Sequence, residues 1–243
     1  MSKIKSNKAP ARNRPAACLA AALTYAAITL CHPALAQNAQ STPVSIEASV
    51  SLEWDQTKGV YIAIGDAIVE QDDKRLKADK IIARYDSQSE GRDLTDVTAT
   101  GSVVFINGDN VARGAKLDYI IGDDTYDLAG PQAIVTSPRG RMTATGSITY
   151  NASDIANKQV VAIGAAAYED DTGRVVEGER VVAFLGEDGS INTIDAEGEA
   201  KVVTPKGIVA TADRLNYVAT TDRADLFGNV EIIDRDNIMR GAR

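Results

Sequence analysis

The feature of this sequence that most constrains its fold is a unit of about 30 residues that recurs over residues 44–243. In its clearest copy, Val97–Tyr119, apolar or small residues alternate with polar ones around Gly101. The turn Asn107-Gly108 then separates this run from a second one. Alternation with a period of two, interrupted by Asn-Gly, is typical of a β-hairpin. Recurrence at a nearly fixed spacing indicates stacked supersecondary units.

Two landmarks define each copy. The first is a glycine, and glycines of successive copies are 29–36 residues apart; the second is a small residue 13–15 positions later. The glycines are Gly65, Gly101, Gly130, Gly164, Gly198 and Gly228, and the small residues are Ala78, Gly114, Thr145, Gly178, Ala212 and Gly241. We interpret the glycines as strand bends or points of close backbone approach rather than as parts of a catalytic site.

The N-terminal 36 residues are typical of a cleaved secretory signal peptide. Basic residues precede the apolar run Ala16–Leu30, and Ala34-Leu35-Ala36 matches a cleavage site. The apolar run is too short to span a bilayer, although an uncleaved anchor is the alternative interpretation. The predicted organisation is a signal peptide over 1–36, a polar lead over 37–43 and one domain over 44–243.

Composition excludes several functions for the mature chain. Cys18, Cys31 and His32 are the only cysteines and histidine, and all three lie in the predicted signal peptide. Their removal leaves no Cys-His or Ser-His-Asp nucleophile and no His/Cys zinc site, so we expect no enzyme, no metal site and no cofactor. The remaining 21 Lys and Arg against 34 Asp and Glu give a net charge of −13, which disfavours nucleic acid as a partner.

The repeat predicts an all-β fold of about a dozen short antiparallel strands, because short turns join consecutive strands. Within each unit the alternation slips by one residue after the small landmark: Ala210 and Ala212 are in one phase, Leu215 and Tyr217 in the other. A slip of one residue reverses the faces of a strand unless a bulge or bend intervenes. Bends at the same place in every unit would fold the sheet over on itself around a dry apolar seam.

One strand face is apolar in every unit, and we predict that it lines this seam, either as ordinary core or as an apolar groove. Recurring tyrosines on that face, Tyr150 among them, would add hydroxyl groups to the groove. The predicted lining is Tyr61, Val69, Val97, Val103, Phe105, Leu117, Tyr119, Tyr126, Leu128, Ile134, Val160, Tyr168, Ile194, Val202, Leu215, Tyr217, Leu226, Val230 and Ile232.

Both ends of the repeat array fall within a unit, so we expect unpaired strand edges that add a strand from another chain. Such contacts would be head-to-tail and would build open chains. The predicted edge residues include Val230, Ile232 and Ile238 at one end. At the other end they are Ile46, Ala48, Val50, Leu52 and Trp54, which alternate on one apolar face.

The repeat resembles the OstA-like domain of lipopolysaccharide transport. The most similar stretches are Ile62–Ala83 and Ala210–Glu231, each with a glycine, a turn and an Ala-Asp pair. The resemblance implies a β-jellyroll, also called a β-taco, that binds lipid A acyl chains between its two halves. It also implies a periplasmic bridge from the inner to the outer membrane. Its partners would be lipopolysaccharide, inner-membrane LptC-like and outer-membrane LptD-like OstA domains, and further copies of the chain.

The chain departs from the family pattern at the residue after the small landmark. That residue is Asp79 and Asp213 in two copies but Ala115 and Gly146 in others, and Ser49-Val50 reads as an insertion. Three alternatives stay open. They are an LptC-like component of the same pathway, an extracytoplasmic scaffold or adhesin with a filled core, and a polysaccharide enzyme that uses paired carboxylates.

The last alternative depends on the Asp pairs. Asp170-Asp171 and two similar pairs, Asp72-Asp73 and Asp123-Asp124, all fall at predicted turns. Asp is favoured there because its side chain bonds to the local backbone, and this is the interpretation we prefer.

Overall fold

The computed structural model describes residues 44–89, 92–151 and 158–241. The predicted signal peptide, 1–36, and the polar lead, 37–43, lie outside the described residues. The folded unit that clusters by backbone contacts spans Ser41–Arg243.

The described residues are almost entirely β-structure, with one short 3-10 turn, η1 (Ala219–Thr221). Seventeen strands are present in this part of the chain: β1 (Ser45–Glu47), β2 (Ser51–Asp55), β3 (Val60–Gln71), β4 (Lys74–Tyr85), β5 (Leu94–Asn107), β6 (Asn110–Ile120), β7 (Thr125–Ala129), β8 (Ala133–Ser137), β9 (Gly140–Ala144), β10 (Ser147–Asn151), β11 (Gln159–Asp170), β12 (Val175–Leu185), β13 (Ile191–Val203), β14 (Val209–Val218), β15 (Arg223–Phe227), β16 (Glu231–Asp234) and β17 (Asn237–Arg240). The all-β antiparallel prediction is confirmed.

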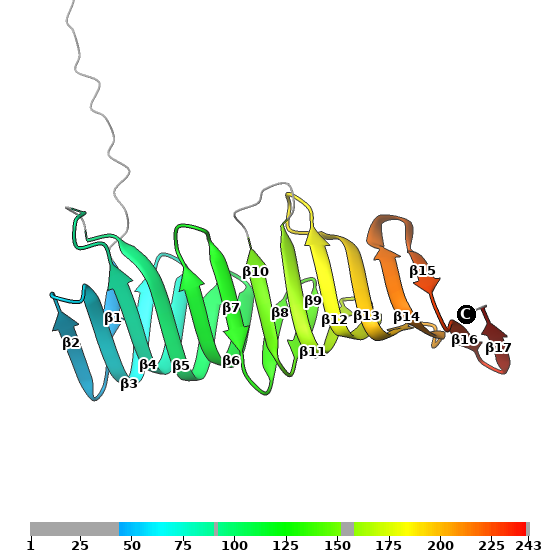
Figure 1. Ribbon diagram of the computed structural model, residues 1–243, viewed down its shortest axis with the longest axis horizontal. Helices are drawn as coiled ribbons and strands as arrows, with labels where there is room; N and C mark the ends of the chain where they lie inside the picture. The colour runs from blue at the N-terminus through cyan, green and yellow to red at the C-terminus, as the bar shows by residue number, and fades with distance from the viewer. Residues whose placement is uncertain (1–43, 90–91, 152–157, 242–243) are drawn as a thin grey trace, which may run out of the picture. The chain divides into compact units, whose positions relative to one another are not determined.

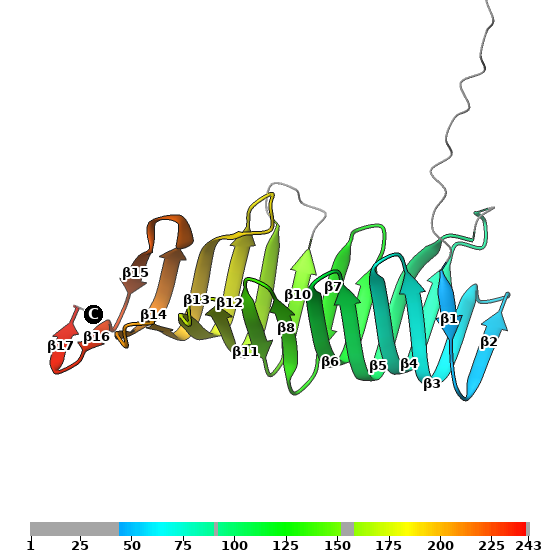
Figure 2. The same cartoon turned by 180° about the vertical axis from the view of Figure 1, so that it is seen from behind.

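The strands belong to one sheet that is creased into two halves. In the first half-sheet, β2 pairs with the start of β3, and the order continues through β4, β5, β6, β7, β10, β11, β12, β13 and β14 to β15. In the second half-sheet, β1 pairs with the end of β3, and β8, β9, β16 and β17 replace β7, β10 and β15. Every long strand therefore contributes one half to each. The repeats follow one another along the unit from β1 to β17 (Figure 1, Figure 2).

The crease runs through the landmark glycines. All six have a positive φ, and at five of them the next residue has one too, as at Gly101 (φ 78°) and Ser102 (φ 48°). Gly198 and Glu199 occupy the register gap opposite the single residue Asp213, which is a two-against-one bulge. The predicted bend is therefore present, and it explains why the alternation slips only on the partner strand.

Three expectations need correction. Among the described residues there are seventeen strands, not about a dozen, because breaks after Gly130 and around Gly146 split the central strands and bends split the terminal ones. Ile134 faces away from the seam. It pairs with Thr143 and Arg113, while its neighbours Ala133 and Val135 lie on the core side.

Ser49-Val50 has a similar effect at the other end of the fold, because these two residues lie over Gly65 where the single residue Asp79 lies over Gly101. This pair places Val50 over Gly65, with its side chain 75% exposed, instead of on the apolar face. In both places one extra residue at the crease reverses the direction of the following side chain.

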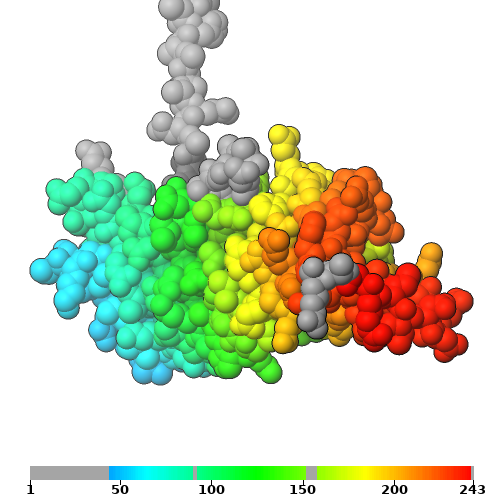
Figure 3. All heavy atoms as spheres, turned by 45° about the vertical axis from the view of Figure 1, so that its right-hand side comes forward, coloured from blue at the N-terminus to red at the C-terminus, as the bar shows by residue number. Residues whose placement is uncertain are grey.

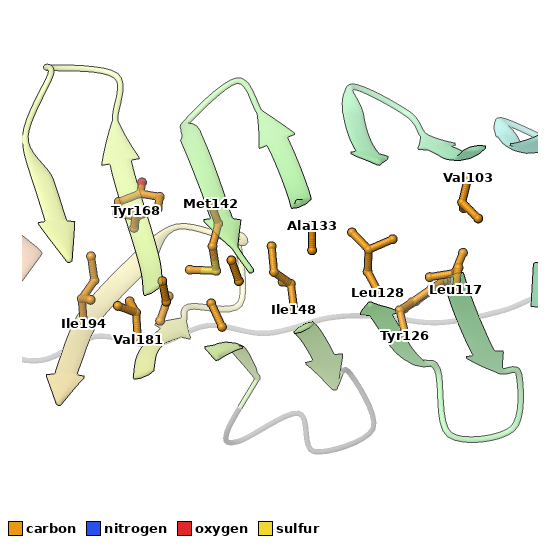
Figure 4. Packing of buried hydrophobic residues seen from close by; sticks show 14 of the residues in the cluster. Val103, Leu117, Tyr126, Leu128, Ala133, Met142, Ile148, Tyr168, Val181 and Ile194 are labelled. Atoms are coloured by element: carbon orange, nitrogen blue, oxygen red, sulfur yellow. The ribbon is translucent and has the colours of Figure 1, made fainter. Parts of the chain in front are cut away.

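The core is a single apolar layer between the half-sheets. Val103, Met142 and Tyr168 project from the second half-sheet toward Leu128 and Ile194 of the first (Figure 4). The described residues contain no buried side-chain polar atom without a hydrogen-bond partner. The space-filling view shows the units following one another in order, with the β16–β17 hairpin extending beyond β14 (Figure 3).

Candidate functional site: an apolar cavity between the half-sheets

The apolar layer is not completely filled. A cavity of about 320 Å³ lies in its central part, between β5–β6 and β12–β13. This volume is at the lower end of the range for small-molecule sites. The lining residues are Phe105, Asn107, Asn110, Ala112, Leu117, Tyr126, Leu128, Val135, Ser137, Arg139, Gly140, Met142, Ile148, Tyr150, Val160, Tyr168, Ala183, Leu185, Gly189 and Ile191. The polar ones come from strand ends and turns, so the cavity has an apolar floor and a polar rim.

The structure divides the predicted groove residues into three groups. Six line the cavity: Phe105, Leu117, Tyr126, Leu128, Val160 and Tyr168. Eleven pack in the same apolar layer without lining the cavity: Tyr61, Val69, Val97, Val103, Tyr119, Ile194, Val202, Leu215, Tyr217, Leu226 and Ile232. The remaining two, Ile134 and Val230, are outside the apolar cluster.

Several lining residues were missed by the sequence reasoning. Val135 was hidden by the extra residue after Gly130, and Met142 and Ile148 lie on the short strands β9 and β10 next to an irregular landmark, Thr145. Period-two alternation in Arg141–Ala144 was the available signal for Met142. Ala183 and Leu185 alternate with Phe184 on β12 in the same way.

Aromatic side chains form one wall of the cavity. The ring of Tyr126 stacks on Phe105 of the other half-sheet at 5.3 Å between centroids and on Tyr119 at 4.2 Å. Burial raises the pKa of Tyr126 well above its ordinary value, and burial raises the pKa of Tyr168 to about 12. Both phenols are therefore neutral at physiological pH, and they add hydroxyl groups to the wall without adding charge.

The turns at the open margins of the two half-sheets contact each other across the seam. We call the turns of the first half-sheet, among them 186–190 and 219–222, the first lip. Those of the second half-sheet, among them 138–139 and 171–174, are the second lip. Arg139 of the second lip lies 3.8 Å from Asp188 of the first (Nη1 to Oδ2). Arg174 of the second lip forms a 2.6 Å ion pair with Asp222 of the first (Nη2 to Oδ1). Toward the N-terminal end, the Lys74 ammonium lies 5.8 Å from the centre of the Tyr119 ring.

Both ends of the folded unit expose apolar side chains. At the β2 end these are Val50, Leu52 and Trp54, and at the β17 end Phe227, Ile238 and Met239. Leu52 and Trp54 pair with Ala63 and Tyr61 of the core face, so the apolar layer continues to the β2 edge of the described residues.

The described part of the chain contains no helix that is long and apolar enough to cross a membrane.

Comparison with known proteins identifies one family and several similar solved structures. The family model for the LptA/(LptD N-terminal domain) LPS transport protein matches residues 45–155 and 173–243. The crystal structure of LptH, the LptA-homologous periplasmic component of the lipopolysaccharide transport device of Pseudomonas aeruginosa, is 20% identical with a TM-score of 0.28. The match covers 65% of this chain and 83% of that one. No curated protein matches.

Proposed function

The chain belongs to the family of LptA and the LptD N-terminal domain, which are lipopolysaccharide transport proteins, and we propose that it is a periplasmic bridge of that system. In this proposal it carries lipopolysaccharide from the inner to the outer membrane, with the lipid A acyl chains held between the two half-sheets. It is a carrier and not an enzyme.

The observation that carries the proposal is the unfilled apolar space in the middle of the seam. Leu117, Leu128 and Met142 surround it with aliphatic surface on both half-sheets. An acyl chain in such a space is shielded from water as it is in a bilayer, where each buried CH₂ contributes about 0.8 kcal/mol. Exchange between bilayer and groove is then nearly balanced, so the direction of transport comes from other components.

The exposed apolar ends support the proposed partners. Trp54 at the β2 end is 44% exposed and Ile238 at the β17 end is 54% exposed, each on a strand that pairs on one side only within the described residues. Addition of a strand from another chain would satisfy such an edge and extend the seam. We propose LptC-like and LptD-like OstA domains and further copies of this chain as these partners.

The two main alternatives are less well supported. A scaffold with a filled seam would not leave about 320 Å³ beside Leu128 and Met142. In the enzyme alternative, Asp170 would act on a sugar. Its carboxylate instead accepts hydrogen bonds from the Thr172 hydroxyl and from the backbone N–H and guanidinium of Arg174, which fits a role in the turn.

The proposal is tested by native mass spectrometry of the protein purified from the periplasm of a lipopolysaccharide-producing bacterium. We expect a bound species with the mass of a lipopolysaccharide or its lipid A part. A protein that carries no lipid, and that takes none up from lipid A micelles, would contradict the proposed function.

A further inference from the structure

The two lips of the cavity carry opposite charges at the places where they touch. The second lip contributes Arg139 from the β8–β9 turn and Arg174 from the residue before β12. These turns are neighbours, because Gly140 pairs with Asp170 across β9 and β11. The first lip contributes Asp188 from the β12–β13 turn and Asp222 from the residue after η1. Each arginine faces one of these carboxylates.

Arg139 is anchored through its backbone, while its guanidinium is exposed. The hydroxyl of Tyr168, a cavity-lining residue, donates a hydrogen bond to the Arg139 carbonyl oxygen at 3.0 Å. The side chain itself is 50% exposed, and its 3.8 Å partner Asp188 is 68% exposed. Exposed pairs at this distance are screened and contribute little to stability. The guanidinium is therefore held at the rim of the cavity by a contact that another anion can replace.

Arg174 is held more firmly, both by its own turn and by Tyr217 of the first half-sheet, whose hydroxyl accepts a hydrogen bond from the guanidinium. Asp170 of its own turn binds it at 3.0 Å, and both side chains are mostly buried, at 15% and 16% exposure. The guanidinium also lies 4.6 Å from the centre of the Tyr217 ring. Asp222, its partner on the first lip, has a side chain that is 74% exposed. Loss of Asp222 would leave Arg174 held through Nη1 by Asp170 and Tyr217, with its Nη2 group available to another anion.

We propose that Arg139 and Arg174 form a phosphate-binding site on the second lip, and that Asp188 and Asp222 occupy it when the groove carries no lipid. A phosphorylated amphiphile would place its tail in the cavity and its phosphate on the two arginines, in exchange for the carboxylates. This inference rests on the proposed function, because it identifies the part of the ligand that the rim recognises.

The exchange would also separate the lips. Guanidinium groups bind phosphate and carboxylate oxygens through the same paired geometry, and a phosphate monoester carries more charge than a carboxylate. Asp188 stays ionised, because the hydroxyl of Ser190 donates a hydrogen bond to it and lowers its pKa. The displaced carboxylates and the bound phosphate would repel each other across the seam. A cavity of about 320 Å³ would then widen to admit a lipid with several chains.

The binding test compares bisphosphorylated lipid A with the same lipid after removal of both phosphates. We expect Arg139→Gln and Arg174→Gln each to lower the affinity for the phosphorylated form about tenfold or more, since hydrogen bonds to charged groups are worth at least that ratio. The affinity for the dephosphorylated form should change less, so that the preference for the phosphorylated form falls about tenfold. Arg113→Gln, which removes an exposed arginine from β6, is the matched control and should leave both affinities unchanged.

The opening test measures the distance between spin labels at Asp171→Cys and Glu187→Cys, one on each lip. The labels are introduced in the chain from residue 37 onward, which contains no native cysteine, because Cys18 and Cys31 both precede it. We expect a longer distance with phosphorylated lipid A than with the dephosphorylated form. Asp188→Asn together with Asp222→Asn should lengthen it without lipid. If Arg174→Gln fails to fold, the label distance is measured in Asp222→Asn instead. That variant removes the ion pair across the seam but leaves the bond between Arg174 and Asp170 in place.

The results separate this inference from the proposed function. If wild-type protein binds neither lipid form, the proposed function fails. If it binds both forms equally, and no lip variant changes affinity or distance, only the phosphate site is overturned. Inorganic phosphate is the third arm and should compete weakly, because it has no tail. Full competition by millimolar phosphate would assign the site to the free anion and would also overturn the inference.

Discussion

At the residue scale, the recurring glycine and the recurring Ala-Asp pair are two sides of one contact. A Cβ at Gly101 would lie 2.2 Å from the Asp79 carboxylate, and one at Gly228 would lie 2.2 Å from Asp213. The residue after the small landmark therefore crosses the glycine of the next strand, on the outside of the crease. Ala115 takes this place over Gly130. The position needs a side chain that fits over a glycine more than it needs a carboxylate.

This contact predicts that Gly101→Ala destabilises the fold more than Gly173→Ala does. Both glycines have a positive φ, 78° and 87°, so both substitutions incur backbone strain of about 1–2 kcal/mol. Only at Gly101 would the new Cβ also overlap the neighbouring side chain, whereas at Gly173 nothing lies within 4 Å. Urea unfolding of both variants checks this. Equal losses would show that the crossing side chain does not constrain the crease.

At the scale of the elements, the sequence predicts the fold well wherever the glycine frame is regular. The bulges at Gly101 and Gly198 lie where the phase slip places them. The frame fails where one residue is added at the crease, at Ser49-Val50 and after Gly130, because strand faces have a period of two. The position of the cavity could not be predicted. It depends on how large side chains from two distant units meet, and alternation reports the face of a residue but not what lies opposite.

Leu128 and Leu215 allow the cavity to be distinguished from the filled seam. Both are 2% exposed, but only Leu128 lines the cavity. Leu215→Ala should lower the free energy of unfolding by about 2–5 kcal/mol and leave lipid binding unchanged. Leu128→Ala should cost less, because one side of that residue already borders empty space, and it should weaken lipid binding. Denaturant unfolding and lipid titration measure the two effects. A full core penalty at Leu128 with unchanged binding would favour the scaffold alternative.

At the scale of the whole molecule, the proposed head-to-tail assembly depends on the strand edges at the two ends of the fold. Ile232 pairs with Ala210 and Met239 inside the fold, so a substitution there would disturb the domain itself. Ile238 is a better probe. In the β16–β17 hairpin, Asp234 and Asn237 flank the two-residue turn, and the alternation of hydrogen-bonded pairs directs the Ile238 N–H away from β16.

We therefore expect Ile238→Pro to reduce head-to-tail association while the domain stays folded, since proline removes only the outward N–H. Ile238→Val keeps that N–H and is the control. Light scattering over a concentration series should show growing chains for the wild type and for Ile238→Val, and shorter ones for Ile238→Pro. A wild-type protein that remains monomeric at high concentration would rule out self-association and leave only the contacts with other proteins to examine.

The central claim is that the seam between the half-sheets holds the acyl chains, and site-specific photo-crosslinking in lipopolysaccharide-producing cells tests it most directly. Probes at Phe105 and Val135, which line the cavity, should capture lipopolysaccharide. Probes at Ile134 and Thr98 should not, because Ile134 faces away from the seam and Thr98 pairs its side chain with Asp118 on the outer face. Capture at Val135 but not at its neighbour Ile134 is the predicted result. Equal capture at all four positions, or capture only at the outer ones, would contradict the account.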